Sequence, residues 1–290
     1  MGLRIQNNVE AFNTHRQLTA TSLAASKSME KLSSGYRINR AADDAAGLAI
    51  SEKMRGQIGG LAQAQRNAQD GVSLVQTGEG ALNEVHSMLQ RVRELKVQYD
   101  NDTLNDSDKS SIVNEVLSLQ SEIKDIRNNT SFNGIKLLDG TAVGSAGSAS
   151  AGTVTLQVGA NAGETIAITA KDIFASGGTT SGLAAVNSLT SASAGANSFA
   201  SLTVSDIDNA IQEVSTRRAE FGAVQNRLEH RLNNLATYQE NLVASESRIR
   251  DVDMAKEMVN FTKLQILQQA GTSMLAQANQ SPQGVLSLLR

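Results

Sequence analysis

The chain has 290 residues, no cysteine, one proline and 3 % aromatic residues, while hydrophobic residues reach 40 % and the formal net charge is −3. The absence of cysteine excludes disulfides, thiolate nucleophiles and cysteine-based metal sites. The composition favours long helices packed by aliphatic side chains, and the acidic balance argues against nucleic acid as a partner.

The N-terminal sequence MGLRIQNNVEAF has no basic stretch followed by an apolar one, so we expect no cleavable secretory signal. No window approaches about 18 consecutive apolar residues, so we expect no insertion into a membrane. These features predict a cytoplasmic protein, unless the chain leaves the cell by a route that needs no such signal.

Two helices are predicted one after the other in the first half of the chain. Between residues 61 and 99, apolar side chains recur at steps of three, four or seven, which indicates a helix. Turn-forming residues at 101–106 interrupt this pattern, and a second stripe then runs from Ile112 to Ile126. We expect the pair to form an antiparallel helical hairpin.

The longest apolar stripe runs from Ile207 to Val252, over about 46 residues without a break. At its start, Ser205 and Asp208 fit a capping box, in which a hydroxyl and a carboxylate three residues on cap a helix. A stripe of this length indicates coiled-coil packing, and an ordinary globular helix core is the alternative.

The centre of the chain has a different pattern. Apolar and polar residues alternate over 154–158 and over 166–168, which predicts a short β-hairpin, and Asn133-Gly134 predicts a turn. Residues 141–152 and 175–201 are rich in Ser, Gly, Ala and Thr, so we expect exposed loops or mobile segments there.

Both ends of the chain carry amphipathic stripes. The N-terminal stripe contains Ile5, Val9 and Phe12. The C-terminal stripe contains Met258, Phe261, Leu264, Leu267, Gly271 and Met274. Pairing the two ends within one molecule would bury only one side of each. Residues 1–40 and 251–290 are therefore expected to be largely disordered in the monomer and to order when many copies pack together.

The segment 27–44 changes from basic to acidic along the chain, and we call it the charge switch. Four basic residues precede two acidic ones, in the order Lys27, Lys31, Arg37, Arg40, Asp43 and Asp44. Either these side chains form a solvated surface, or they make ion pairs between subunits of an assembly. The two adjacent carboxylates suggest the start of a helix rather than an acid and base pair.

Several long motifs occur in one order along the chain. They are MGLRIQNNVEAFNTHRQLTATSLAASKSMEKLSSGYRINRAADDAAGLAISEKMRGQI, QRVRELKVQ, SFNGIKLLDG, LQVGANAGETI and QANQSPQGVLSLLR. In these motifs the sequence closely resembles bacterial flagellin, and the resemblance covers roughly residues 1–170 and 203–290.

The resemblance implies a mainly α-helical fold. It would be a long antiparallel coiled coil or helical bundle with paired N- and C-terminal helices and a small β-hairpin in the centre. Residues 1–42 and 251–290 would form an inner terminal coiled-coil domain. Residues 43–172 and 203–250 would form a rod-like helical domain with the hairpin. Residues 173–202 would be a short, exposed variable segment in place of large outer domains.

The resemblance also implies a function and partners. The chain would be a structural subunit that polymerises with itself into the flagellar filament used for swimming. It would be exported through the flagellar type III apparatus to an extracellular location. An export chaperone would bind the C-terminal helix, at about residues 251–290, and filament cap and hook-junction proteins would be further partners.

Some members of the family are recognised by a vertebrate Toll-like receptor. The residues that match this recognition region are Arg91, Leu95 and Glu115. Arg91 and Arg93 are two residues apart and point to different faces of a helix, so one is free to meet a partner while the other supports the rod. The alternative is that all the matching residues serve filament contacts only.

An enzymatic function is not expected. The three histidines, His15, His86 and His230, are scattered and form no metal-binding motif, and we predict no catalytic residue, cofactor or metal. Gly78-Glu79-Gly80 is a chance match to a dinucleotide fingerprint. Two alternatives to a filament subunit are a hook–filament junction protein of the same architecture and a cytoplasmic coiled-coil signalling scaffold.

Overall fold

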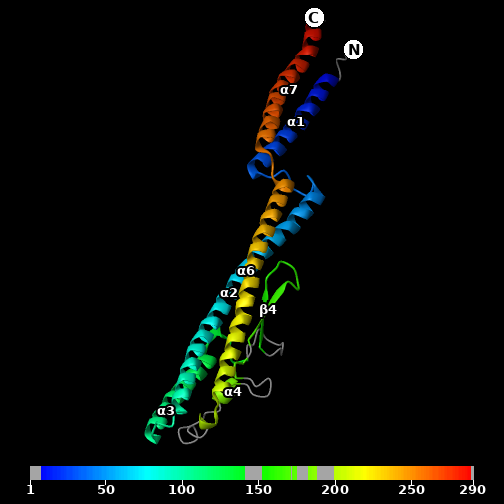
Figure 1. Cartoon of the computed structure of the whole chain (residues 1–290). Coiled ribbons are helices and arrows are strands. Elements are labelled where there is room, and N and C mark those ends of the chain that lie inside the picture. The colour runs from blue at the N-terminus through cyan, green and yellow to red at the C-terminus, as the bar shows by residue number, and fades with distance from the viewer. Residues whose placement is uncertain (1–7, 141–151, 171, 175–181, 188–198, 289–290) are drawn as a thin grey trace. The chain divides into compact units, whose positions relative to one another are not determined.

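The computed structural model describes residues 8–140, 152–170, 172–174, 182–187 and 199–288. Its helices are α1 (Val9–Ser34), α2 (Ala45–Tyr99), α3 (Asp106–Asn129), α4 (Gly182–Asn187), α6 (Val204–Arg250) and α7 (Met254–Leu288). Its strands are β1 (Ser131–Phe132), β2 (Ile135–Lys136), β3 (Thr153–Gln157) and β4 (Thr165–Thr169). Figure 1 shows that long helices dominate, so the predicted mainly α-helical fold with a small β-hairpin is confirmed.

The chain divides into two compact units. The terminal unit comprises residues 1–58 and 240–290, and the rod unit comprises residues 59–239. The domain limits predicted from the sequence fall in the loops that follow α1 and α6. The compact terminal unit also includes the beginning of α2 and the end of α6.

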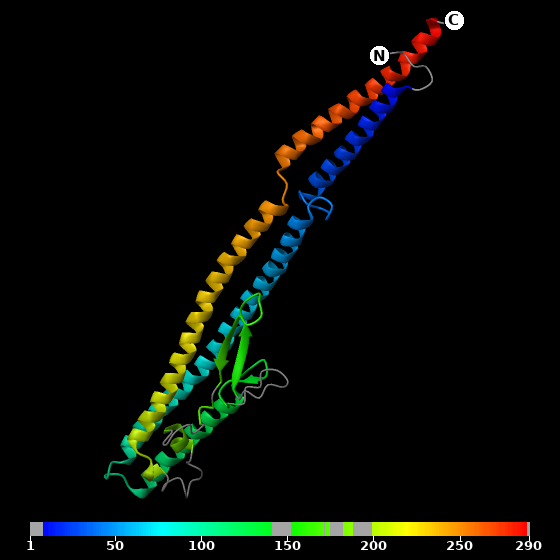
Figure 2. The ribbon, with the colours of Figure 1, turned by 90° about the vertical axis from the view of Figure 1, so that its right-hand side faces the viewer.

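The rod unit is held together by buried residues at heptad spacing. On α2 they are Leu61, Ala64, Ala68, Gly71, Val75, Gly78, Leu82, Val85, Leu89 and Val92. On α6 they are Ile207, Val214, Phe221, Leu228 and Leu235. Two residues of every seven on α2 therefore face the core, which is the spacing of a coiled-coil seam. Figures 1 and 2 show α2 and α6 side by side along this seam.

Two positions of the α2 seam are glycines because larger side chains occupy the space beside them. A Cβ atom on Gly78 would lie 2.8 Å from the Phe221 ring, which comes from α6. A Cβ atom on Gly71 would collide with Leu156 of β3. These glycines let α6 and the β-hairpin approach the α2 backbone closely, and no nucleotide-binding strand precedes the Gly78-Glu79-Gly80 sequence, which lies within α2.

Side chains cap the starts of the long helices, including α2, α3 and α6. Asp44 accepts a hydrogen bond from the Gly47 backbone N–H at 2.9 Å, as its helix-start sequence predicted, and Asn105 caps α3 in the same way. The predicted capping box at Ser205 was wrong by two residues. Instead, the Thr203 hydroxyl accepts from the Asp206 N–H at 3.2 Å, while the Asp206 carboxylate accepts from the Thr203 N–H at 3.0 Å. Two overlapping sequences fit the motif, and the helix begins at the first.

The predicted β-hairpin is confirmed, with β3 antiparallel to β4. It is tied to both long helices, since the Asn67 side chain on α2 donates to the Gln157 carbonyl at 3.0 Å and Arg231 on α6 donates to the Val158 carbonyl at 3.0 Å. The predicted turn at Asn133-Gly134 joins β1 to β2, and both of its residues have positive φ angles. This is the geometry that an Asn-Gly turn provides.

The segment 173–202 is less exposed than its composition predicted. Residues 175–181 and 188–198 lie outside the described residues, as do 141–151. The described part buries several apolar side chains, namely Ile173, Leu183, Val186, Phe199 and Leu202. These scattered apolar residues give the Ser- and Gly-rich segment enough surface to pack on the rod.

Phe199 packs this segment against α2 beside the buried Lys96. Lys96 follows Leu89 at heptad spacing, and its side chain is 3 % exposed. Its ammonium group forms an ion pair with Asp100 at 2.5 Å and lies 5.4 Å from the centre of the Phe199 ring. Phe199 also packs edge-on against Tyr99. The charge is therefore compensated by a carboxylate and aromatic faces.

Two glycines of α2 provide a matched test of the seam. We expect Gly78→Leu to lower the free energy of unfolding by about 1–3 kcal/mol, because the added side chain collides with Phe221. Gly80→Leu should maintain or raise it, because nothing lies within 4 Å of a Cβ there and leucine favours helix. Chemical denaturation of the monomer measures both, and equal effects of the two substitutions would contradict the packing described here.

Candidate assembly surface

Helices α1 and α7 of the terminal unit lie side by side (Figures 1 and 2), and small and polar side chains of α1 contribute to their contact. Thr21, Ala25 and Ser28 are the residues of α1 that are buried. The Ser28 hydroxyl donates a hydrogen bond to the Glu257 carboxylate at 2.6 Å. Near the other end of the pair, the Asn8 side chain donates to the Ala278 carbonyl at 2.7 Å.

The side of α7 that faces α1 follows a regular pattern. Its members are the buried or half-buried residues of the helix at alternating steps of three and four. They are Glu257, Phe261, Leu264, Gln268, Gly271, Leu275 and Ala278. A Cβ atom on Gly271 would lie 3.2 Å from a methyl group of Leu18, so this glycine is a close contact between the helices.

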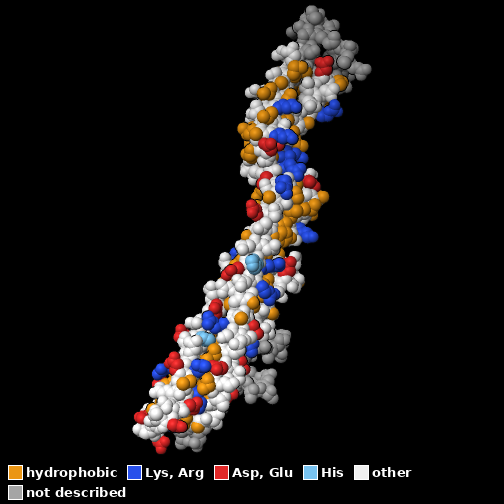
Figure 3. Space-filling model, viewed as in Figure 1, with side chains coloured by type: hydrophobic (Ala, Val, Ile, Leu, Met, Phe, Trp, Pro, Cys, Tyr) orange, Lys and Arg blue, Asp and Glu red, His pale blue; other side chains and the backbone are white. Residues whose placement is uncertain are grey.

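Ten large apolar side chains in the described part of the two helices are exposed and directed away from this seam, whereas Phe261, Leu264 and Leu275 lie on it. Phe12 is 72 % exposed and Val259 is 70 % exposed. We call the exposed set the outer apolar surface; it comprises Val9, Phe12, Leu23, Met29, Met254, Met258, Val259, Ile266, Leu267 and Met274. Figure 3 shows hydrophobic side chains gathered over both helices. So much exposed apolar area is unusual for a monomer and is typical of an interaction surface.

The residues predicted for assembly therefore divide between two places. Phe261, Leu264 and Gly271 lie on the seam side of α7. The outer apolar surface contains the other described residues of that prediction, which are Val9, Phe12, Met258, Leu267 and Met274. Ile5 lies outside the described residues. The prediction missed Val259 and Ile266, which line a shallow hollow with Met258 and which their seven-residue spacing would have revealed.

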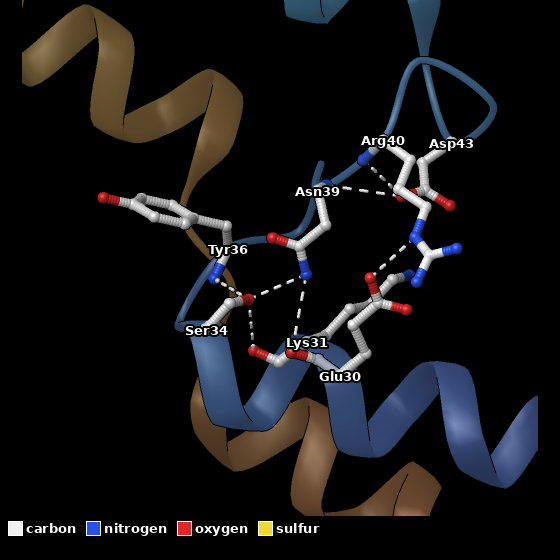
Figure 4. A network of polar contacts seen from close by, with 7 residues as sticks. All are labelled: Glu30, Lys31, Ser34, Tyr36, Asn39, Arg40 and Asp43. Atoms are coloured by element: carbon white, nitrogen blue, oxygen red, sulfur yellow. Dashed lines mark hydrogen bonds and ion pairs between the residues drawn. The ribbon is translucent and has the colours of Figure 1, made fainter.

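A polar joint links the end of α1 to the start of α2 (Figure 4). Gly35 ends α1 with a φ of 75°, which glycine adopts without strain. The Asn39 side chain donates to the Ser34 hydroxyl at 2.7 Å, and Arg40 forms an ion pair with Glu30 at 2.9 Å. The Asp43 carboxylate accepts backbone hydrogen bonds from the N–H groups of Asn39 and Arg40.

The same joint holds the connection between α6 and α7. Tyr36 and Asp251 form an isolated antiparallel bridge, and the Val252 N–H donates to the Gly35 carbonyl at 3.0 Å. Arg250 donates to the Glu52 carboxylate at 2.6 Å and lies over the Tyr36 ring. The sequence signal at 27–44 predicted charge here but not this joint, because its partners lie some 200 residues away.

The predicted receptor residues lie in the rod unit. Arg91 on α2 donates to the Glu115 carboxylate of α3 at 2.9 Å, so these two residues are brought together at the surface. The hydrogen bond from Arg91 to Glu115 raises the pKa of Arg91. Leu95, the third residue of that prediction, is 1 % exposed and belongs to the core of the rod unit. Its position on the apolar stripe of α2 explains its burial.

Arg93 is not free to meet a partner either, because it forms an ion pair with Asp208 of α6 at 2.6 Å. Both arginines therefore bridge helices of the rod. Among the described residues, no group of three His, Asp or Glu side chains is placed to hold a metal ion. Within that same part of the chain, no helix is long and apolar enough to cross a membrane.

A long helical chain whose paired ends expose an apolar surface belongs to the class of self-associating structural proteins. Two family models match it: the bacterial flagellin N-terminal helical region, over residues 5–143, and the bacterial flagellin C-terminal helical region, over residues 204–289. The chain belongs to the bacterial flagellin family.

Curated relatives match the whole length. Flagellin of Bacillus subtilis (strain 168) is 53 % identical over 306 residues, covering 99 % of this chain and 100 % of the relative. The flagellar filament 31.3 kDa core protein of Treponema maltophilum is 44 % identical, covering 99 % of each. A solved structure of a putative flagellar hook-associated protein from Vibrio parahaemolyticus covers 72 % of this chain and 100 % of that one, with a TM-score of 0.54. At 17 % identity, it shows a shared fold alone.

The joint should loosen in acid. The hydrogen bond from Arg250 holds the pKa of Glu52 below its ordinary 4.5, and chiefly the Arg40 N–H holds the pKa of Asp43 below 3.8. Because both pKa values are lowered by folding, their stabilisation is present above about pH 4.5 and is lost as the pH falls through the lowered values.

Hydrogen exchange of residues 36–43 in the assembled protein measures this effect. Corrected for intrinsic exchange, protection should be constant from about pH 6 to pH 4.5 and should fall as the pH is lowered further to about pH 3. Glu52→Gln should reduce protection already at the higher pH and flatten the change, because the ion pair with Arg250 is absent at both. Glu84→Gln, on an exposed part of α2, is the matched control. Identical pH profiles for Glu52→Gln and the unmodified chain would contradict the role of this ion pair.

Proposed function

We propose that this chain is a structural subunit of the flagellar filament and that it polymerises with itself through α1 and α7. The observation that carries the proposal is the outer apolar surface, which a single molecule leaves exposed. Burying one such side chain fully contributes about 1.5–3 kcal/mol. Neighbouring copies supply that burial, and head-to-tail contacts of this kind generate an open helical polymer.

The terminal helices gain their full order in the polymer. On their own seam, α1 contributes the buried residues Thr21, Ala25 and Ser28, and α7 alternates large apolar residues with small or polar ones. The pair therefore buries limited apolar area, and isolated helices are marginal in water. Residues 1–42 and 251–290 are therefore largely disordered in the monomer and form the inner coiled-coil domain on assembly. Residues 43–172 and 203–250 form the rod-like domain, which has a buried core of its own.

Further partners follow from family membership. The exposed hollow along α7 at Met258, Val259 and Ile266 supports binding of an export chaperone to residues 251–290 before assembly. Cap and hook-junction proteins meet the chain at the two ends of the filament. The mature location is extracellular, in the flagellum, and the chain has no enzymatic activity in this proposal.

A hook–filament junction protein is the less supported alternative. The solved hook-associated structure shares the fold at low identity, whereas relatives called flagellin match from end to end at above half identity. The exposed apolar residues are spread along both α1 and α7, which favours contacts repeated throughout a polymer over one contact at a junction.

Substitution of two exposed residues tests the function. We expect the double variant Phe12→Gln and Met258→Gln to raise the critical concentration for seeded filament growth at least about tenfold, since each 1.4 kcal/mol of lost contact free energy changes an equilibrium constant about tenfold. Sedimentation and negative-stain electron microscopy measure it.

Val97→Gln is the matched control, because Val97 is an exposed apolar residue of α2 in the rod unit. Unchanged helical content by circular dichroism shows that the rod is intact. If the Phe12 and Met258 double variant grows filaments as readily as the unmodified chain, the terminal helices do not drive assembly. If the unmodified chain forms no filament with seeds, the proposed function itself is wrong.

We also propose that the exposed Arg91–Glu115 pair is a recognition patch for a vertebrate Toll-like receptor. Its support is that two of the matching residues lie together on adjacent helices, where both remain about half exposed. Leu95 acts only from within the core, by holding α2 in place.

Arg91→Ala in the monomer should weaken receptor binding about tenfold, because charged hydrogen bonds contribute about 1.5–3 kcal/mol. Surface plasmon resonance measures the affinity. Arg66→Ala, which removes an arginine elsewhere on α2, should leave it unchanged. Equal affinity of the Arg91→Ala variant and the unmodified monomer would remove Arg91 from the patch.

A further inference from the structure

A cleft in the terminal unit is lined by residues of α1 and of the 39–43 turn. Leu23, Lys27 and Lys31 follow each other at four-residue spacing and so share one face of α1. Ala42, in the 39–43 turn, also lines the cleft. This arrangement places two flexible cations beside an exposed leucine.

The acidic groups of the cleft are already engaged. Glu30 forms its ion pair with Arg40, and the Asp43 carboxylate accepts the backbone hydrogen bonds of the turn (Figure 4). Within the described part of the chain, the ammonium groups of Lys27 and Lys31 have neither an ion pair nor a hydrogen bond. Asp43 attracts both ammonium groups from a distance, but neither is held in a direct ion pair, so the cleft offers two lysine side chains to the carboxylates of a partner.

A complementary stripe lies on α6 in the same unit. Glu240, Val243 and Glu246 follow each other at three-residue spacing and lie on one side of the helix. Val243 is exposed although apolar, and neither glutamate has an ion pair among the residues that the structure describes. The stripe thus presents a carboxylate on either side of a valine.

The two surfaces match in charge and in length. At 1.5 Å per residue, the two lysines are about 6 Å apart along α1 and the two glutamates about 9 Å apart along α6. The long lysine side chains bridge that difference, and Val243 then lies between the two ion pairs, beside the lysine methylene groups. Opposite charges set the register of such a contact.

We propose that the lysine cleft at Lys27 and Lys31 of one copy binds the stripe from Glu240 to Glu246 of a second copy. This contact rests on the proposed polymerisation and adds to it a specific pair of surfaces. It orients neighbouring subunits, whereas the outer apolar surface supplies most of the burial. Lys27 and Lys31 thereby pair between subunits rather than remain a solvated surface, while Arg40 pairs with Glu30 of its own chain.

Charge reversal on either surface tests the contact. The variant Lys27→Glu and Lys31→Glu, and separately the variant Glu240→Lys and Glu246→Lys, should each slow seeded filament growth about tenfold or more, because like charges would meet. The quadruple variant that combines them should grow within about threefold of the unmodified rate, because the pairing is restored with reversed sign. An equimolar mixture of the two double variants should also recover growth.

The matched control is Lys53→Glu with Lys124→Glu, which changes the net charge equally at exposed or half-exposed lysines outside the cleft. Monomer circular dichroism establishes equal helical content for all variants. Growth of both double variants at the unmodified rate would overturn the contact, and so would a quadruple variant that grows no faster than the slower double variant. In either case the unmodified chain still polymerises, so the proposed function stands. Absence of growth by the unmodified chain would instead contradict the proposed function.

Discussion

The structure depends on which apolar side chains are buried within the chain and which are left exposed. In the rod unit, the seam of α2 supplies two inward positions per heptad, and α6, α3 and the β-hairpin cover them. In the terminal unit, the buried seam positions of α1 carry small or hydroxyl side chains, and ten large apolar residues in the described part of α1 and α7 lie outside. The rod unit buries its apolar side chains within its own chain, whereas the terminal unit needs the surfaces of other copies to bury its exposed ones. This difference separates folding from assembly along a single sequence.

Two glycines on α2 let the β-hairpin and α6 approach its backbone closely. Gly71 and Gly78 occupy seam positions where Leu156 and Phe221 fill the space from the other elements. A third exception on the same helix is Lys96, whose charge is buried with Asp100 and two aromatic rings. At these three positions α2 contacts the hairpin, α6 and the 173–202 segment. These heptad positions, which lack a large apolar side chain, are therefore places where other elements pack on α2.

Hydrophobic spacing predicted the long helices because each buries a continuous stripe. The predicted 46-residue stripe ending at Val252 corresponds to the 47-residue α6, and alternation located β3 and β4. Spacing did not select between the overlapping caps at Thr203 and Ser205, since both satisfy the same motif. It also did not predict which stripe of α7 faces α1, because apolar residues surround that helix and Gly271 is recognised as a contact only through Leu18.

The small seam of the terminal pair has a consequence for how assembly ends. If Phe12 and Val259 pointed into the seam, α1 and α7 would satisfy each other, and the molecule would be complete without partners. Because these side chains point outward, each added copy buries the surface of its neighbour and presents the same surface again. A contact that covers one face while exposing an identical one does not close, so growth continues from the end of the polymer. The arrangement of large and small residues around two helices therefore determines both that copies associate and that association stays open.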